Sequence, residues 1–184
     1  MPILKKIVVI GPESTGKSTL CRDLAAHYHT KWVPEYARQY LLAHGMSYTY
    51  DDLLTIARGQ LAQEEEYVSG QLSVVSEEKD IRYLFVDTDM YVMKVWCEYV
   101  FGKCHPWILE QIQTRHYDGY LLCKTDLPWV KDELREYPDP VTREKLFQIY
   151  RDCMIHQLTP WAEISGPADQ RLLSAVRILN KGIF

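Results

Sequence analysis

The sequence lacks paired cysteines, a basic excess and any long apolar run. Its five cysteines are an odd number, and none of them forms a C-x-x-C pair. Scattered cysteines of this kind are typical of reduced thiols in a cytosolic protein, not of a disulfide framework. Cys104 and His105 are adjacent instead of standing at metal-ligand spacing, so the sequence does not favour a zinc site.

Charge and hydropathy exclude two further classes of protein. The chain has 21 Lys and Arg against 25 Asp and Glu, a net charge of −4, whereas proteins that bind duplex nucleic acid usually carry a basic excess. The apolar run that follows the first lysines, Ile7 to Ile10, is too short for a signal peptide. No uncharged stretch approaches the roughly 18 residues that span a bilayer. We therefore expect a cytoplasmic protein without nucleic-acid or membrane partners, and its self-association stays open.

Apolar runs and helical patterns alternate along the 184 residues, without repeats or an evident linker. Strands separated by helices predict an α/β fold, a P-loop NTPase with a parallel sheet of about five strands and helices on both faces. We expect one domain over residues 1–184 with a charged, proline-containing lid at about 125–143. The expected strands are 3–10, 31–33, 82–86, 119–123 and 161–164. The expected helices are 17–28, one from about 35, then 51–68, 90–101, 106–115, 142–158 and 169–179.

Residues 11–18, GPESTGKS, match the pattern G-x-x-x-x-G-K-[ST] of a phosphate-binding loop. Glycines at its ends permit backbone conformations in which successive N–H groups face phosphate oxygens. The helix that follows adds the positive end of its dipole. We expect Lys17 to reach the β- and γ-phosphates and Ser18 to hold Mg²⁺. The nucleotide-binding residues are then expected to be Gly11, Glu13, Ser14, Thr15, Gly16, Lys17, Ser18 and Thr19.

Two acidic segments follow other strands of the predicted sheet. Asp87 and Asp89 follow the apolar residues Phe85 and Val86. Because they are two positions apart, their side chains point the same way on an extended segment. Asp87 is a candidate metal ligand and general base, although both residues also suit the role of helix caps. Glu35 follows the second strand, with Arg38 one helical turn on, and is the alternative base. The sequence leaves the choice between Asp87 and Glu35 open.

The motifs WVPEYARQYL, FVDTD, His105-Pro106 and LLCKTDLPWVKDELR together resemble the ribosylnicotinamide kinase domain of the NadR family. The resemblance runs in order over nearly the whole chain. It implies an ATP- and Mg²⁺-dependent transfer of phosphate to the 5′-hydroxyl of nicotinamide riboside, which gives the mononucleotide. It does not extend to adenylyl transfer or DNA binding.

The resemblance also implies roles for residues outside the phosphate loop. Asp89, Tyr36 and Arg38 are expected on the substrate side. Trp129 is expected to cover the cationic nicotinamide ring, since a cation is attracted to an indole face. Arg135 and Arg143 flank the lid and are expected to stabilise the transferring phosphoryl group, with Arg135 as a catalytic residue. Arg171 is expected beside the adenine of ATP.

Other functions stay open on the sequence alone. A kinase for another nucleoside or small metabolite is the main alternative, and the preference for ATP over GTP is not fixed. A GTPase-type switch is less favoured. Cys123-Lys124-Thr125-Asp126 resembles the guanine-reading N-K-x-D signature, but a thiol is a poor substitute for the amide of asparagine. Met90 also stands where GTPases have glycine.

Overall fold

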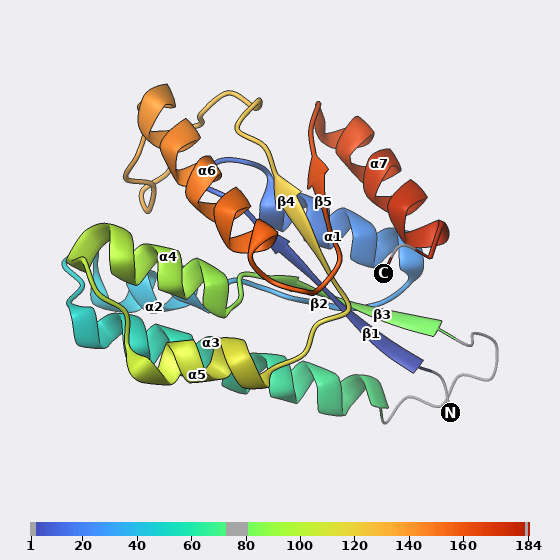
Figure 1. Cartoon of the computed structure of the whole chain (residues 1–184), viewed down its shortest axis with the longest axis horizontal. Coiled ribbons are helices and arrows are strands. Elements are labelled where there is room, and N and C mark those ends of the chain that lie inside the picture. Colours follow the sequence, from blue (N-terminus) through green and yellow to red (C-terminus); the bar gives the residue numbers. More distant parts are fainter. Residues whose placement is uncertain (1–2, 73–80, 183) are drawn as a thin grey trace.

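A five-stranded parallel sheet forms the centre of the protein (Figure 1). The computed structural model describes residues 3–72, 81–182 and 184. The strand order is β2-β3-β1-β4-β5, and every neighbouring pair is parallel. The predicted fold class is thus confirmed. The strands are β1 (Ile3–Ile10), β2 (Trp32–Val33), β3 (Ile81–Asp87), β4 (Gly119–Cys123) and β5 (Trp161–Ile164).

The central strand β1 is buried on both faces. Its last four residues are fully buried, as a continuous apolar run predicts for an interior parallel strand. Val8 pairs with Val86 of β3 and with Tyr120 of β4. This register brings the carboxyl ends of β1, β3 and β4 to one edge of the sheet, where ligands bind in open α/β folds.

Helices cover both faces of the sheet (Figure 1). α1 and α7 pack on one face against Ile7 and Val9, whereas α4 and α6 pack on the other against Val8 and Ile10. Alternate residues of a strand point to opposite faces, so one apolar run supplies both cores. A third cluster joins α2, α3, α4 and α5. The helices are α1 (Lys17–Tyr28), α2 (Tyr36–His44), α3 (Tyr50–Leu72), α4 (Met90–Phe101), α5 (Pro106–Thr114), α6 (Pro140–Ile155) and α7 (Ala168–Asn180).

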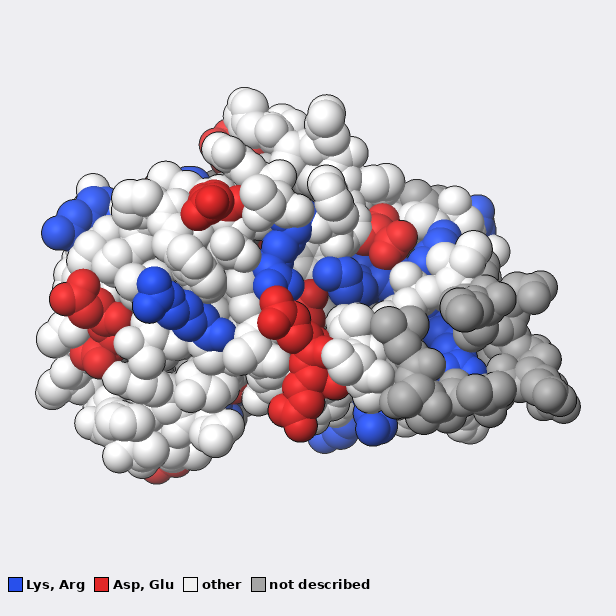
Figure 2. All heavy atoms as spheres, turned by 90° about the horizontal axis from the view of Figure 1, so that it is seen from below, with Lys and Arg blue, Asp and Glu red and all other residues white. Residues whose placement is uncertain are grey.

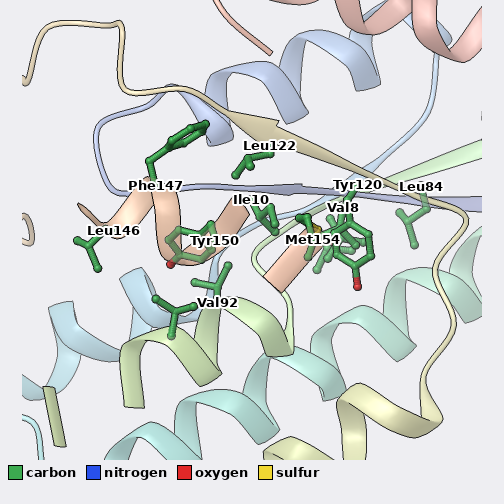
Figure 3. Close-up of a cluster of buried hydrophobic side chains, with 13 residues drawn as sticks. Val8, Ile10, Leu84, Val92, Tyr120, Leu122, Leu146, Phe147, Tyr150 and Met154 are labelled. Atoms are coloured by element: carbon green, nitrogen blue, oxygen red, sulfur yellow. The ribbon is translucent and has the colours of Figure 1, made fainter. Parts of the chain in front are cut away.

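Figure 3 shows the core on the α4 and α6 side of the sheet. Phe147, Tyr150 and Met154 of α6 point towards Leu122 and Ile10 of the sheet and lie in the same buried cluster. Because α6 follows the long connection from β4, this packing fixes the far end of that connection.

The bounds of two helices differ from the expectation by more than one residue: α3 extends to Leu72 instead of about Val68, and α6 ends at Ile155 instead of near Leu158. α6 begins at Pro140 instead of near Thr142. The side chain of Asp139 accepts a hydrogen bond from Thr142 N at 2.7 Å, and proline is favoured in the first turn because its missing N–H has no partner there. Between Cys123 and Pro140 the chain forms no helix or strand, and this connection, which holds most of the predicted lid, is called the lid below.

Charges of both signs are mixed on the face of α3 and α5 seen in Figure 2. Arg115 pairs with Glu65 and Lys6 with Glu64 among the side chains of this region. Where the structure describes this face, it carries no broad basic surface. None of the described helices is both long and apolar enough to cross a bilayer.

The burial of the sheet residues generates a stability prediction. Leu84 of β3 is fully buried, so Leu84→Ala is expected to lower the free energy of unfolding by about 2–5 kcal/mol. Leu158 is fully exposed, and Leu158→Ala is expected to change it by less than about 0.5 kcal/mol. Urea unfolding of both variants measures the difference, and equal effects would contradict the assigned core.

Candidate phosphate-transfer site

The loop between β1 and α1 takes the unusual backbone conformations that its glycines permit. Gly11 has φ 138°, and a Cβ there would lie 2.7 Å from the carbonyl oxygen of Cys123. Gly16 has φ 77° and Ser14 φ 57°. A side chain at position 11 would push β1 away from β4, so this glycine is required for the loop to sit against the sheet edge.

The backbone N–H groups of this loop lack acceptors in the part of the chain that the structure describes. Among the described residues, no acceptor takes a hydrogen bond from the N–H groups of residues 13–19. The loop instead satisfies its side chains internally: Thr15 Oγ1 and Lys17 Nζ donate to the carbonyl oxygen of Pro12 at 2.7 and 2.9 Å. Unpaired N–H groups at a helix N-terminus form an anion-binding cradle.

The cradle opens into a cavity of about 230 Å³. α2 and α4 form one side of the cavity, whereas the connection from β4 to α6 and two residues of α6 form the other. Outside the loop, the lining is mainly apolar and aromatic. It comprises Glu35, Ala37, Arg38, Leu41, Val92, Val95, Trp96, Tyr99, Asp132, Leu134, Arg135, Glu136, Tyr137, Leu146 and Tyr150.

Three cationic side chains line the cavity. Arg38 of α2 pairs with Asp132 of the lid at 3.1 Å, which joins two walls. Lys17 and Arg135 have no carboxylate partner among the described residues. Two cations that form no ion pair with a described carboxylate, beside unpaired amides, favour a polyanion at this place.

Asp87 lies at the end of β3 beneath the cradle and is fully buried. Neither of its carboxylate oxygens completes a hydrogen bond with a described residue. Burial and the neighbouring Glu35 carboxylate together raise the pKa of Asp87 to about 7, while Lys17 and Ser18 oppose the rise. A buried carboxylate with free oxygens beside a serine hydroxyl suits a hard cation, and Mg²⁺ needs few protein ligands where phosphates are present. The residues present therefore fit Mg²⁺.

Glu35 and Asp87 are held together by a residue that the sequence did not single out. The side chain of Gln60 on α3 accepts a hydrogen bond from Tyr36 N at 2.7 Å and donates to the carbonyl oxygens of Pro34 and Asp87, each at 3.4 Å. Gln60 is 1% exposed. Its position three residues after Ala57, on the apolar side of a predicted helix, was the available signal.

Asp89 does not line the cavity. It caps α4, where one oxygen accepts from Tyr91 N and Val92 N at 3.0 and 3.3 Å, and the other accepts from the hydroxyl of Tyr120 at 2.9 Å. Burial raises its pKa to about 7, although these hydrogen bonds act in the opposite direction. Its oxygens are already occupied by protein donors.

The lid is fastened to the phosphate loop itself. The side chain of Glu13 accepts hydrogen bonds from the backbone N–H groups of Glu136 and Tyr137 and from the indole of Trp129 at 3.4 Å. Ser14 Oγ accepts a further one from Val130 N at 3.0 Å. The loop thus binds the lid through its side chains and leaves its backbone amides to the cavity.

Besides Asp87 and Asp89, three predicted ligand-binding residues lie outside the cavity wall: Tyr36, Trp129 and Arg171. The indole of Trp129 contacts Glu13, and the ring of Tyr36 packs so closely on α3 that a Cβ at Gly59 would lie 2.1 Å from it. Arg171 is 1% exposed, and its guanidinium N–H groups donate hydrogen bonds to protein acceptors. Their contacts with ligands stay predictions.

Asp126, the last residue of the segment that resembles the guanine-reading signature, makes its contacts within the protein. One oxygen of Asp126 pairs with Arg171, and the other accepts from Gly166 N. A guanine-reading aspartate must offer both oxygens to the base. In this conformation Asp126 is occupied by the protein, which argues against the GTPase alternative.

The Glu13 contacts generate a prediction about the lid. Glu13→Ala removes the acceptor of three lid donors, so amide hydrogen exchange at Glu136 and Tyr137 is expected to accelerate about 10- to 100-fold, the range for a hydrogen bond to a charged group. Exchange is followed by mass spectrometry or NMR. Glu133→Ala, an exposed lid glutamate, is the control and should leave these amides unchanged. Unchanged exchange in Glu13→Ala would show that Glu13 does not hold the lid.

Known proteins share this fold and parts of this sequence. Relatives include the trifunctional NAD biosynthesis/regulator protein NadR of Salmonella typhimurium, 30% identical over 149 residues, which are 79% of this chain and 34% of that protein. NadR of Escherichia coli is 28% identical over 183 residues, 97% of this chain and 42% of that protein. The chain therefore spans about two fifths or less of the length of these relatives.

Solved structures show the same fold. A crystal structure of NadR protein in complex with NR superposes with a TM-score of 0.74 at 22% identity, over 96% of this chain and 51% of that chain. Thymidylate kinase from Ehrlichia chaffeensis has a TM-score of 0.65 at 13% identity, over 97% of this chain and 99% of that chain. The model of the AAA domain family matches residues 6–171, from β1 to Arg171. The chain therefore belongs to the AAA domain family of P-loop proteins.

Proposed function

We propose that the chain is a kinase that transfers the γ-phosphate of ATP to the 5′-hydroxyl of nicotinamide riboside. The observation that carries this proposal is the continuity between the free amides of residues 13–19 and a cavity with aromatic walls. Such a site holds a polyphosphate and a flat acceptor side by side. The related NadR protein has been crystallised with NR, and also with NAD and AMP-PNP, which supports both ligands.

Phosphate transfer at this site depends chiefly on positioning and charge. The loop amides and Lys17 bind the β- and γ-phosphates, and Arg135 faces the same space from the lid. Charge that develops on the transferred group is then met by fixed donors. The lid excludes water, which would otherwise accept the phosphate, because Glu13 and Ser14 fasten it over the loop.

Ser18 and Asp87 are the residues that would hold Mg²⁺. The ion would supply positive charge to the phosphate oxygens. Asp87 suits this role better than it suits contact with an acceptor, since it is fully buried and does not line the cavity.

Glu35 is the stronger candidate for the proton acceptor. Its side chain lines the cavity beside the phosphate loop, whereas Asp87 lies beneath it. A general base must come within hydrogen-bond reach of the hydroxyl whose proton it takes. Gln60 bonds to the backbone on either side of Glu35 and to the carbonyl oxygen of Asp87, and so sets the separation of the two carboxylates.

The acceptor side of the cavity favours a flat, cationic ring. Trp96, Tyr99 and Tyr137 supply aromatic surface. The rings of Tyr99 and Tyr137 pack edge to face, with 5.4 Å between the ring centroids. Glu35 and Glu136 add negative charge to the wall. Nicotinamide riboside carries a positive ring, which aromatic faces and carboxylates both attract. Trp129 and Asp89 would join this side only if their present partners, Glu13 and Tyr120, exchanged for ligand.

A kinase for another nucleoside or nucleotide is the second candidate. The similarity of the fold to thymidylate kinase over almost all of both chains supports it.

A nucleoside panel tests the proposal. The chain is incubated with ATP, Mg²⁺ and nicotinamide riboside, uridine, thymidine or adenosine, and the products are identified by mass. Nicotinamide mononucleotide is expected as the main product. Lys17→Ala is expected to abolish transfer while the thermal midpoint stays unchanged, because Lys17 contacts the loop and not the core. Preferred phosphorylation of another nucleoside would refute the substrate, and full activity of Lys17→Ala would refute the site.

A pair of isosteric variants distinguishes the roles of the Glu35 and Asp87 carboxylates. Glu35→Gln is expected to lower kcat by about 10²–10⁴ with little change in the Mg²⁺ concentration needed for half-maximal rate. Asp87→Asn is expected to raise that Mg²⁺ requirement as well. Rates measured over a Mg²⁺ titration distinguish the two roles. The base would instead be Asp87 if Glu35→Gln lowered kcat only slightly while Asp87→Asn was inactive. In that case excess Mg²⁺ would not restore the activity of Asp87→Asn.

Two tryptophan variants locate the ring of the acceptor. Trp96→Leu is expected to raise KM for nicotinamide riboside several-fold, and more than for the neutral reduced riboside, since a cation–π contact contributes about 0.5–2 kcal/mol. Trp129→Leu is expected to affect both nucleosides equally, because its indole contacts the phosphate loop. Steady-state kinetics with both nucleosides give the ratios. The reverse pattern would place the ring against Trp129.

A further inference from the structure

Arg171 of α7 is a buried cation whose donors all face protein oxygens. It is 1% exposed, yet it stands next to the phosphate loop. Its guanidinium N–H groups meet four backbone carbonyl oxygens and one carboxylate. The acceptors are Gly166 O at 2.6 Å, Thr15 O at 3.1 Å, Lys124 O at 3.1 Å, Ile164 O at 3.3 Å and the side chain of Asp126.

The bond to Thr15 O has a consequence for the next amide. In a trans peptide the C=O of one residue and the N–H of the following residue point in opposite directions, and the chain has no cis peptide among the described residues. Because Arg171 draws the carbonyl of Thr15 inward, the N–H of Gly16 points away from Arg171. Gly16 lines the cavity, and its N–H has no acceptor among the residues that the structure describes.

A second buried arginine acts on the preceding peptide. Arg143 of α6 is 4% exposed, and its Nη2 donates to the carbonyl oxygens of Ser14 and Leu127, each at 3.2 Å. The same geometry turns the N–H of Thr15 away from Arg143. Two arginines from the C-terminal helices thus hold consecutive carbonyls of a loop near the N-terminus.

We propose that Arg171 and Arg143 are positioning residues for phosphate binding: they fix the Ser14–Thr15 and Thr15–Gly16 peptides so that two N–H groups face the phosphates before the ligand arrives. This inference rests on the proposed function, since it concerns the same loop. It assigns Arg171 an indirect role in place of direct contact with the nucleotide. It likewise assigns Arg143 to the loop backbone instead of to the transferring phosphoryl group.

The loop needs such support because its conformation is costly. Ser14 has φ 57° and Gly16 φ 77°, and like-directed amide dipoles repel one another without an anion. A guanidinium suits this task, since its planar fork donates to several carbonyls at once and it keeps its charge when buried. Asp126 partly offsets that charge through its ion pair with Arg171.

The test compares Arg171→Met with Asp126→Asn. Both remove the ion pair, but only Arg171→Met frees the carbonyl of Thr15. Binding of inorganic tripolyphosphate, which has no base or sugar, is measured by calorimetry, and thermal unfolding is recorded for each protein. We expect Arg171→Met to weaken tripolyphosphate binding about tenfold or more, the range for a hydrogen bond to a charged group. Asp126→Asn is expected to lower the thermal midpoint but to change binding less than about threefold.

The outcomes separate the two proposals. No binding of tripolyphosphate by the unsubstituted chain would refute the proposed function together with this inference. Binding by the unsubstituted chain and by Arg171→Met with equal affinity would refute the inference alone, as would equal losses in Arg171→Met and Asp126→Asn.

A second measurement needs no substitution and covers the case in which Arg171→Met does not fold. A crystal structure of the unsubstituted chain with tripolyphosphate is expected to show Gly16 N and Thr15 N within hydrogen-bond distance of phosphate oxygens. Arg171 should still contact Thr15 O, and Arg143 should still contact Ser14 O. A rotated peptide at either position, or an arginine that has left its carbonyl to bind phosphate, would overturn the inference.

Discussion

The unpaired amides of the phosphate loop are the constraint on which the rest of the site depends. The first N–H groups of a helix have no partner within it, and those of residues 13–19 find no other acceptor among the described residues. Neighbouring elements satisfy the other polar groups of the loop. Its carbonyls accept from Lys17, Arg143 and Arg171, and its side chains bind the lid. Among the described residues, the backbone N–H groups that stay unsatisfied belong to residues that line the cavity.

The fold could be predicted from the sequence because its signals are local. Buried parallel strands read as continuous apolar runs, and the bounds of β1, β4, β5, α1 and α4 agree with those runs and with the glycines and prolines between them. The sequence predicts the start of α6 two residues too late. The cap formed by Asp139 and the first-turn position of Pro140 start the helix within the charged segment. Local chemistry decided both the agreement and the difference.

The site could be predicted only in part, because several roles depend on partners far along the chain. The phosphate-loop motif and the two acidic strand ends were visible as patterns. Nothing in the pattern showed that Glu13 would bind residues more than 100 positions away, or that Gln60 would join the ends of β2 and β3. A buried polar residue on an apolar helix face, such as Gln60, marks such a link but does not name its partner.

The contact between Glu13 and the lid joins two walls of the cavity. Residues 130, 136 and 137 of the lid contact Glu13 and Ser14 of the phosphate loop, and the Arg38–Asp132 pair adds a second link from α2 to the lid. These contacts form within the chain itself, so a ligand that enters or leaves past the lid would have to break them. If the chain is the kinase proposed above, the strength of these few hydrogen bonds would limit the rate at which products leave, independently of the chemical step.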